Sequence, residues 1–166
     1  MHCPRRVTDE LLSERLAGVL TGRVVVVGVG DERRGDDGAG PMIAGLLSGA
    51  GVESVIDSGP SPEVDTWRIR ELVPDVVLFA DAVDLGGSPG DAALLEPSEL
   101  RRSGFDTHRA PLRLTMQYLE SELKARCYLL AVQPADVRTG SPMCAEVKRT
   151  AANLAEMLSG ILARKD

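Results

Sequence analysis

The chain of 166 residues has no long apolar run and no long basic run. Its uninterrupted apolar stretches, such as residues 24–27 and 127–132, are far shorter than the roughly 18 residues that a membrane helix needs. Lysine and arginine occur at most in pairs, and 25 acidic against 19 basic residues give a net charge of −6. A phosphate backbone would be repelled by this charge on average. We therefore expect neither a membrane nor nucleic acid as a partner.

Cysteine is scarce, and no secretion signal can be recognised. The three cysteines, Cys3, Cys127 and Cys144, are odd in number and widely separated, with no Cys-x-x-Cys pair. This pattern fits reduced thiols better than disulfides or a zinc ribbon. The basic N-terminus continues into the charged residues 8–10 instead of an apolar core, so it does not resemble a signal peptide. We predict a soluble cytoplasmic protein.

Two common catalytic and cofactor signatures are missing or incomplete. There is no Gly-x-Ser-x-Gly elbow, and neither histidine adjoins a cysteine in any recognised catalytic pattern, so serine or cysteine nucleophiles are unsupported. Gly28 and Gly30 begin a dinucleotide fingerprint, but position 33 is arginine where the third glycine should be. The favoured interpretation is that these two glycines form a tight turn after the strand. A nucleotide-binding, Rossmann-like oxidoreductase or transferase, with Asp57 contacting a ribose, remains an alternative.

Apolar runs that predict buried strands alternate with amphipathic stretches that predict helices. The expected strands are residues 24–27, 52–56, 75–80, 92–95 and 127–132, and the expected helices are 9–20, 41–47, 63–72, 98–103, 112–123 and 142–162. This alternation predicts an α/β three-layer sandwich, with a mostly parallel twisted central sheet flanked by helices. The length favours one domain over residues 1–166, with an N-terminal helical extension over about 1–22.

Aromatic residues make up only 3% of the chain, and there is a single tryptophan, Trp67. It shares a predicted helix with Ile69 and Leu72. A lone aromatic residue with no stacking partner nearby in the sequence indicates packing. We predict that Trp67 is partly buried and takes no part in chemistry.

Acidic and imidazole side chains follow the predicted strands at the edge where parallel sheets gather their ligands. Asp36 and Asp37 follow the first strand, Asp81 follows the third, and His108 lies in the loop before the fifth helix. Carboxylate and imidazole groups both bind borderline metals such as nickel or zinc. The sequence therefore indicates a candidate divalent metal site.

Each of these residues also has an ordinary structural interpretation. Either Asp36 or Asp37 can cap the next helix, and Asp81 can form a turn with the amides that follow it. His108 can be a solvated loop residue, and Asp84 competes with Asp81 as the functional aspartate. No one of these residues is decisive alone.

The stretch Gly28-Val-Gly-Asp-Glu-Arg-Arg-Gly-Asp-Asp-Gly-Ala-Gly-Pro41 resembles the opening motif of the hydrogenase maturation proteases. That motif is Gly-x-Gly-Asn, a short loop, and then Asp-Asp/Glu-Gly-x-Gly. Further blocks occur in the family's order: Ile56-Asp-Ser-Gly-Pro-Ser-Pro-Glu63, Phe79-Ala-Asp-Ala-Val-Asp84, Thr107-His-Arg-Ala-Pro-Leu112 and Val132-Gln-Pro134. The resemblance runs from about Arg23 to the C-terminus and is greatest to the hydrogenase-3-type branch.

The resemblance implies an endopeptidase that removes the C-terminal extension of a [NiFe]-hydrogenase large-subunit precursor after nickel insertion. By position, it implies that Asp37, Asp81 and His108 are the catalytic residues and the metal contacts of an aspartic-type, nickel-dependent peptidase. The nickel would come with the substrate, and no organic cofactor is expected. The implied partner is the large-subunit precursor, and we expect a monomer. A non-catalytic nickel chaperone that uses the same side chains is a further alternative.

The chain departs from the family pattern in the loop before Asp37. Asp31 stands where the family has asparagine, and Arg33 and Arg34 replace residues that are often apolar. These changes add charge beside the proposed metal contacts. We therefore expect substrate docking to differ in detail, with the same three contacts. Whether a carboxylate serves as base or only as metal ligand stays open.

Overall fold

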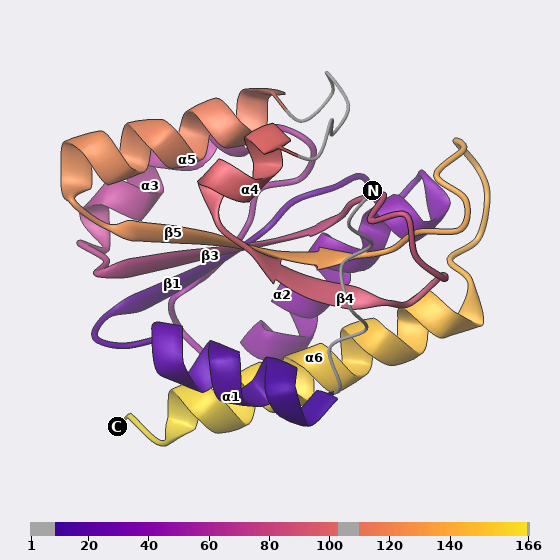
Figure 1. Cartoon of the computed structure of the whole chain (residues 1–166), viewed down its shortest axis with the longest axis horizontal. Coiled ribbons are helices and arrows are strands. Elements are labelled where there is room, and N and C mark those ends of the chain that lie inside the picture. The colour runs from indigo at the N-terminus through magenta and orange to yellow at the C-terminus, as the bar shows by residue number, and fades with distance from the viewer. Residues whose placement is uncertain (1–8, 103–109, 166) are drawn as a thin grey trace.

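The computed structural model describes residues 9–102 and 110–165, which form a five-stranded sheet covered by helices on both faces (Figure 1). The strands are β1 (Val24–Gly28), β2 (Val55–Asp57), β3 (Val76–Ala82), β4 (Ala92–Leu95) and β5 (Arg126–Val132). Their order in the sheet is β2-β1-β3-β5-β4. All neighbouring pairs are parallel except β4 and β5, which pair antiparallel at one edge. The predicted mostly parallel α/β sandwich is confirmed.

The helices divide between the two faces of the sheet (Figure 1). They are α1 (Asp9–Val19), η1 (Gly35–Gly38), α2 (Ala39–Gly49), η2 (Pro62–Asp65), α3 (Thr66–Glu71), α4 (Pro97–Arg102), α5 (Ala110–Leu123) and α6 (Ala145–Ala163). Helices α1, α2 and α6 cover one face, and α3, α4 and α5 cover the other. None of these helices combines the length and the apolar character that a membrane crossing requires.

Strand β3 explains why an unbroken apolar run predicts a central strand. All seven of its residues are buried. Val76 and Leu78 pack into the core beneath α1, α2 and α6, whereas Val77 and Phe79 pack into the core beneath α3, α4 and α5. Because successive side chains of a strand point to opposite faces, a strand covered on both faces is apolar at nearly every position, and in β3 only Asp81 departs from this pattern.

Helix α1 is built into the core. Its residues Leu12 and Leu16, and Leu20 just after it, are at most 1% exposed and belong to the core shared with α2 and α6. The N-terminal extension expected from the sequence is therefore not a detached appendage, because its apolar stripe closes one face of the sandwich.

Several local predictions were wrong. Strand β2 begins at Val55 instead of residue 52, and α6 begins at Ala145 instead of residue 142. Trp67 is 58% exposed, because Ile69 takes the inward position of the short helix α3 and is completely buried. The tryptophan is therefore a surface residue and not part of the packing.

Both cysteines among the described residues are free thiols, as predicted. Cys127 is buried within β5, and burial raises the pKa of its thiol to about 12. A thiol with such a pKa stays protonated and unreactive near neutral pH.

Candidate active site

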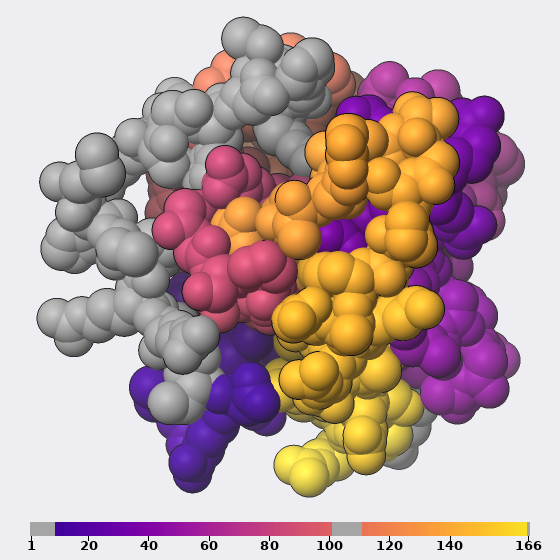
Figure 2. All heavy atoms as spheres, turned by 90° about the vertical axis from the view of Figure 1, so that its right-hand side faces the viewer, coloured from indigo at the N-terminus to yellow at the C-terminus, as the bar shows by residue number. Residues whose placement is uncertain are grey.

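The strands β1, β2, β3 and β5 all end at one edge of the sheet, on the right in Figure 1 and facing the viewer in Figure 2. Helix α2 leads from β1 to β2 on one face, and α3 leads from β2 to β3 on the other face. The direction of winding therefore reverses between β1 and β3. Open α/β sheets bind their ligands at such a switch point.

Three glycines bring α2 close to the ends of β1 and β3. A Cβ atom on Gly40 would overlap the carbonyl oxygens of Val29 and Ala80, and one on Gly28 would overlap the carbonyl of Gly40. Gly30 has a φ of +140° and lies against the carbonyl of Asp37. The glycines thus allow close packing within the chain, in agreement with the tight-turn interpretation. They give no support to a dinucleotide site.

Asp37 and Asp81 flank the switch point. Asp37 lies in η1, which packs against β3, and its Oδ2 accepts a hydrogen bond of 2.9 Å from the N–H of Asp31. Asp81 is the second-last residue of β3, pairs with Ala131 of β5 and is 0% exposed. Asp37 is only partly buried, so solvent reaches it more readily than Asp81.

His108, the third predicted site residue, lies outside the described residues. Its position in the sequence is two residues before α5, which begins at Ala110. Because α5 leads into the parallel strand β5, its first turn lies at the same sheet edge as the switch point. By strand alternation, Asp81 belongs to the face that α5 covers, together with Val77 and Phe79.

Asp36 holds two loops together. It is 0% exposed, and its carboxylate accepts hydrogen bonds from the backbone N–H groups of Ala135 (2.8 Å), Asp136 (3.0 Å) and Cys144 (2.7 Å). The alternative interpretation, in which Asp36 or Asp37 caps the following helix, was wrong. The N-cap of α2 is Gly38, and it makes no side-chain hydrogen bond.

The same contacts set the charge state of Asp36. Burial alone would raise the pKa of this carboxyl group, but the N–H donors of Cys144, Asp136 and Ala135 outweigh burial and lower the pKa below the usual 3.8. Asp36 is therefore an anion at neutral pH, bound by backbone dipoles. These contacts also explain why α6 starts late, since they hold residues 135–144 in an extended loop.

In the loop between β1 and η1, the charges of Asp31 and Arg33 neutralise each other. Arg33 donates to both carboxylate oxygens of Asp31, at 3.0 Å and 2.9 Å, and these hydrogen bonds lower the pKa of Asp31 to about 2. Arg34 turns away and donates from its Nε to the carbonyl of Val137 at 3.1 Å. The extra carboxylate of Asp31 is thus matched by the extra cation of Arg33.

Gln133 is a supporting residue to which the sequence analysis gave no role. It is 7% exposed, and its Oε1 accepts from the N–H groups of Leu85 (2.5 Å) and Gly87 (3.3 Å). Its Nε2 donates to Asp84 at 3.2 Å. The segment that follows Asp81 is therefore fastened to the end of β5. The sequence did contain a signal for this role, because Gln133 is a polar residue directly after the apolar strand β5.

Two other aspartates that the sequence put forward stabilise their own turns. Asp84 accepts a hydrogen bond from the N–H of Gly86 at 2.9 Å, and Asp57 accepts one from Gly59 at 3.1 Å. Both are exposed and form the local turns that aspartate favours. Asp84 therefore has a structural explanation, and Asp57 has one that needs no ribose.

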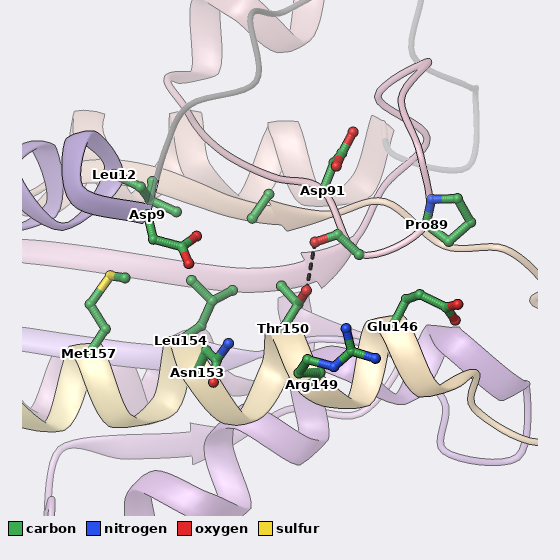
Figure 3. A pocket seen from close by; sticks show the side chains of 12 residues that line it. Asp9, Leu12, Pro89, Asp91, Glu146, Arg149, Thr150, Asn153, Leu154 and Met157 are labelled. Carbon is green, nitrogen blue, oxygen red and sulfur yellow. Dashed lines mark hydrogen bonds between the residues drawn. The ribbon is translucent and has the colours of Figure 1, made fainter.

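A hollow of about 400 Å³ lies elsewhere, between α1, the segment before β4, and α6 (Figure 3). Asp9, Asp91, Glu146 and Arg149 contribute charged groups to its lining. The hollow includes neither Asp37 nor Asp81. It is therefore separate from the switch point.

The described carboxylates do not form a metal site on their own. Within residues 9–102 and 110–165, no group of three or more histidine, cysteine, aspartate or glutamate side chains is placed to hold a metal ion. Asp37 and Asp81 offer hard oxygen donors, and a transition metal held there would need further ligands.

Comparisons with known proteins agree on one family. The family model described as hydrogenase maturation protease matches residues 48–161. The hydrogenase 3 maturation protease of Escherichia coli K12 is 34% identical over 139 residues, covering 82% of this chain and 88% of the relative. A putative hydrogenase maturation protease of Methanocaldococcus jannaschii is 26% identical, with 92% and 95% coverage. The crystal structure of the [NiFe] hydrogenase maturation protease HycI of Thermococcus kodakarensis superposes with a TM-score of 0.83 at 30% identity, covering 90% of this chain and 99% of that one.

Proposed function

The chain belongs to the hydrogenase maturation protease family, and we propose that it removes the C-terminal extension of a [NiFe]-hydrogenase large-subunit precursor after nickel insertion. The observation that carries the proposal is the placement of two carboxylates, Asp37 and Asp81, at the switch point of the sheet. That is where this class of fold builds its active sites.

We assign recognition of the substrate's nickel to Asp37, Asp81 and His108. Two carboxylates and one imidazole are too few and too hard to retain nickel firmly alone, but they complete a coordination sphere to which the substrate brings thiolates. Nickel bound in this way belongs to the substrate and acts as a Lewis acid on the scissile carbonyl.

The different burial of the two carboxylates suggests different roles. Asp81 is 0% exposed within β3, whereas Asp37 is partly buried on η1. An attacking water reaches Asp37 more easily, so we assign proton acceptance to Asp37 and nickel orientation to Asp81. The hydrogen bond from the N–H of Asp31 fixes the Asp37 carboxylate in this position.

Further hydrogen bonds hold the segments that carry Asp37 and Asp81 in fixed positions. Asp36 ties the η1 turn to residues 135–144, and Gln133 ties the segment after Asp81 to β5. Positioning to within about an ångström is decisive for hydrolysis, because a displaced group loses its alignment with the carbonyl. These bonds explain how a surface loop holds a carboxylate rigidly.

The test is incubation of the purified protein with nickel-loaded precursor, followed by intact-mass measurement of the precursor. The unaltered protein should produce the loss of a C-terminal peptide. Asp37→Asn and His108→Ala should each slow the cleavage roughly a hundredfold or more. Asp57→Asn is the matched control, since Asp57 ends the neighbouring strand, is exposed, and forms a turn that asparagine also forms.

Circular dichroism should show the same fold in every variant. Transfer of nickel without any loss of mass would contradict the proposal and favour the chaperone. Wild-type rates for Asp37→Asn would contradict the assigned site.

A further inference from the structure

Four exposed apolar side chains form one surface across η2, α3 and α5. Val64 is 61% exposed, Trp67 58%, Leu114 57% and Tyr118 40%. Val64 and Trp67 are three residues apart on η2 and α3, and Leu114 and Tyr118 are four apart on α5, so each pair occupies one helical face. We call these four residues the α3–α5 patch.

The two halves of the patch lie side by side. Helix α5 packs against both η2 and α3. Figure 1 shows α5 beside α3. A hydrogen bond of 2.9 Å from the guanidinium of Arg70 on α3 to the hydroxyl of Tyr118 on α5 joins them directly. Buried Ile69 on α3 and Met116 on α5 anchor the helices to the sheet, so the patch is carried on a rigid base.

The patch has the composition of a protein-binding surface. It contains the only tryptophan of the chain and one of its two tyrosines, beside an arginine. Tryptophan, tyrosine and arginine are the residues that most often dominate the binding energy of protein interfaces. An exposed group of large apolar side chains is costly in water, and it indicates that a partner covers it.

The patch is continuous with the candidate active site. Helix η2 begins at Pro62, three residues after Gly59, whose carbonyl accepts a hydrogen bond of 2.9 Å from Gly30 in the turn before Asp37. The first turn of α5 lies at the same sheet edge. A protein bound at the switch point can therefore extend along η2, α3 and α5 without a break.

The charges favour the substrate, and not a second copy of this chain, as the partner that covers the α3–α5 patch. Arg70 is exposed and donates one hydrogen bond to Tyr118, and its guanidinium has further N–H donors that can bind a carboxylate of a partner. A twofold dimer through the patch would bring the two Arg70 side chains into one small interface, between chains that each carry a net charge of −6.

We propose that the α3–α5 patch docks the folded body of the large-subunit precursor, through an apolar area of the precursor that has a carboxylate facing Arg70. The inference rests on the proposed function and names the surface that holds the substrate while its tail enters the active site. Docking of this kind contributes to affinity for the precursor and leaves the chemistry of the cut unchanged.

Steady-state cleavage of nickel-loaded precursor tests the proposal. Trp67→Ala and Tyr118→Ala should each raise KM roughly tenfold or more and change kcat by less than about twofold. Leu46→Ala is the matched control, because Leu46 is a 43% exposed apolar residue on α2, which covers the opposite face of the sheet. It should keep the KM of the unaltered protein.

A second measurement observes the surface directly. Labelling with 5-fluorotryptophan gives one fluorine resonance, because Trp67 is the sole tryptophan. Nickel-loaded precursor without the label should shift or broaden that resonance, and the protein alone should show no change as its concentration rises.

The outcomes separate this inference from the proposed function. Normal cleavage with an unmoved resonance and an unchanged KM for Trp67→Ala would overturn the docking surface and leave the function standing. A concentration-dependent dimer that Trp67→Ala abolishes would overturn it in favour of a second copy. Failure of the unaltered protein to cleave would overturn both.

Discussion

Asp36 and Asp37 are adjacent in the sequence, carry the same chemical group, and differ in what surrounds them. Asp36 is completely buried among backbone N–H groups from residues 135, 136 and 144. Asp37 is partly buried at the switch point, beside the N–H of Asp31. The first aspartate therefore stabilises the loop, and the second stays partly exposed at the switch point.

The contacts of Asp36 predict a pH-dependent contribution to stability. Its folded-state pKa lies below 3.8, so the stabilising contribution is complete above that pH and is lost as the pH falls through the folded value. Asp36→Asn should lower the free energy of unfolding by about 1–3 kcal/mol at pH 7, since one backbone donor is left facing an amide.

Urea denaturation at several pH values checks this prediction. The difference between the unaltered protein and Asp36→Asn should shrink as the pH is lowered below 3.8. A difference that stays constant from pH 7 to pH 3 would mean that the carboxylate charge of Asp36 does not stabilise the loop.

Residue roles could be predicted from the sequence only in part. The motif singled out a pair of acids after β1, but the distinct role of Asp36 depends on residues about a hundred positions later, which no local pattern reveals. Trp67 was misjudged because a six-residue helix has one inward position, and Ile69 occupies it. Asp37 follows β1 as expected, whereas Asp81 lies inside β3 and not after it, because β3 continues to Ala82. His108 lies outside the described residues.

At the scale of elements, strand and helix positions followed from apolar periodicity, and their ends did not. β3 was predicted within two residues of its end because all its positions are apolar or buried. The start of α6 was missed because proline at 142 suggested a first helical turn, whereas tertiary hydrogen bonds hold that segment as a loop. Element ends depend on contacts that are distant in sequence.

The close approach of α2 to the sheet gives a prediction with a built-in control. Gly40→Ala should destabilise the protein by about 1–3 kcal/mol, because the new Cβ would overlap the carbonyls of Val29 and Ala80. Gly45→Ala, in the same helix, should stabilise it by about 0.4–1 kcal/mol, since no atom lies within 4 Å of the new Cβ. Thermal unfolding of both variants measures this difference, and equal melting temperatures would contradict the close packing.

Helix α1 provides the second prediction at this scale. Leu16→Ala should lower the free energy of unfolding by about 2–5 kcal/mol, because Leu16 is 0% exposed in the core beneath α2 and α6. Leu11→Ala, at a residue 52% exposed on the same helix, should change it by less than about 0.5 kcal/mol. If Leu16→Ala were as harmless as Leu11→Ala in urea denaturation, α1 would be dispensable for the fold.

At the scale of the whole molecule, the alternating pattern was sufficient to predict the three-layer α/β sandwich. The same pattern implied that polar residues after parallel strands share one edge, because right-handed crossovers return every strand in the same direction. The family followed from motif blocks spread along the chain and is supported by relatives that cover most of it. The docking surface was not predictable, since it depends on which helical faces remain uncovered.

The central claim is that the protein recognises nickel that is already seated in its substrate. The most direct test compares cleavage of nickel-loaded and nickel-free precursor at equal concentrations, using intact-mass spectrometry and metal analysis of the purified protein. We predict cleavage of the nickel-loaded precursor alone, by a protein that retains no stoichiometric metal, because Asp37, Asp81 and His108 form an incomplete ligand set. Equal cleavage of the two precursors, or one tightly bound zinc per chain, would contradict the account.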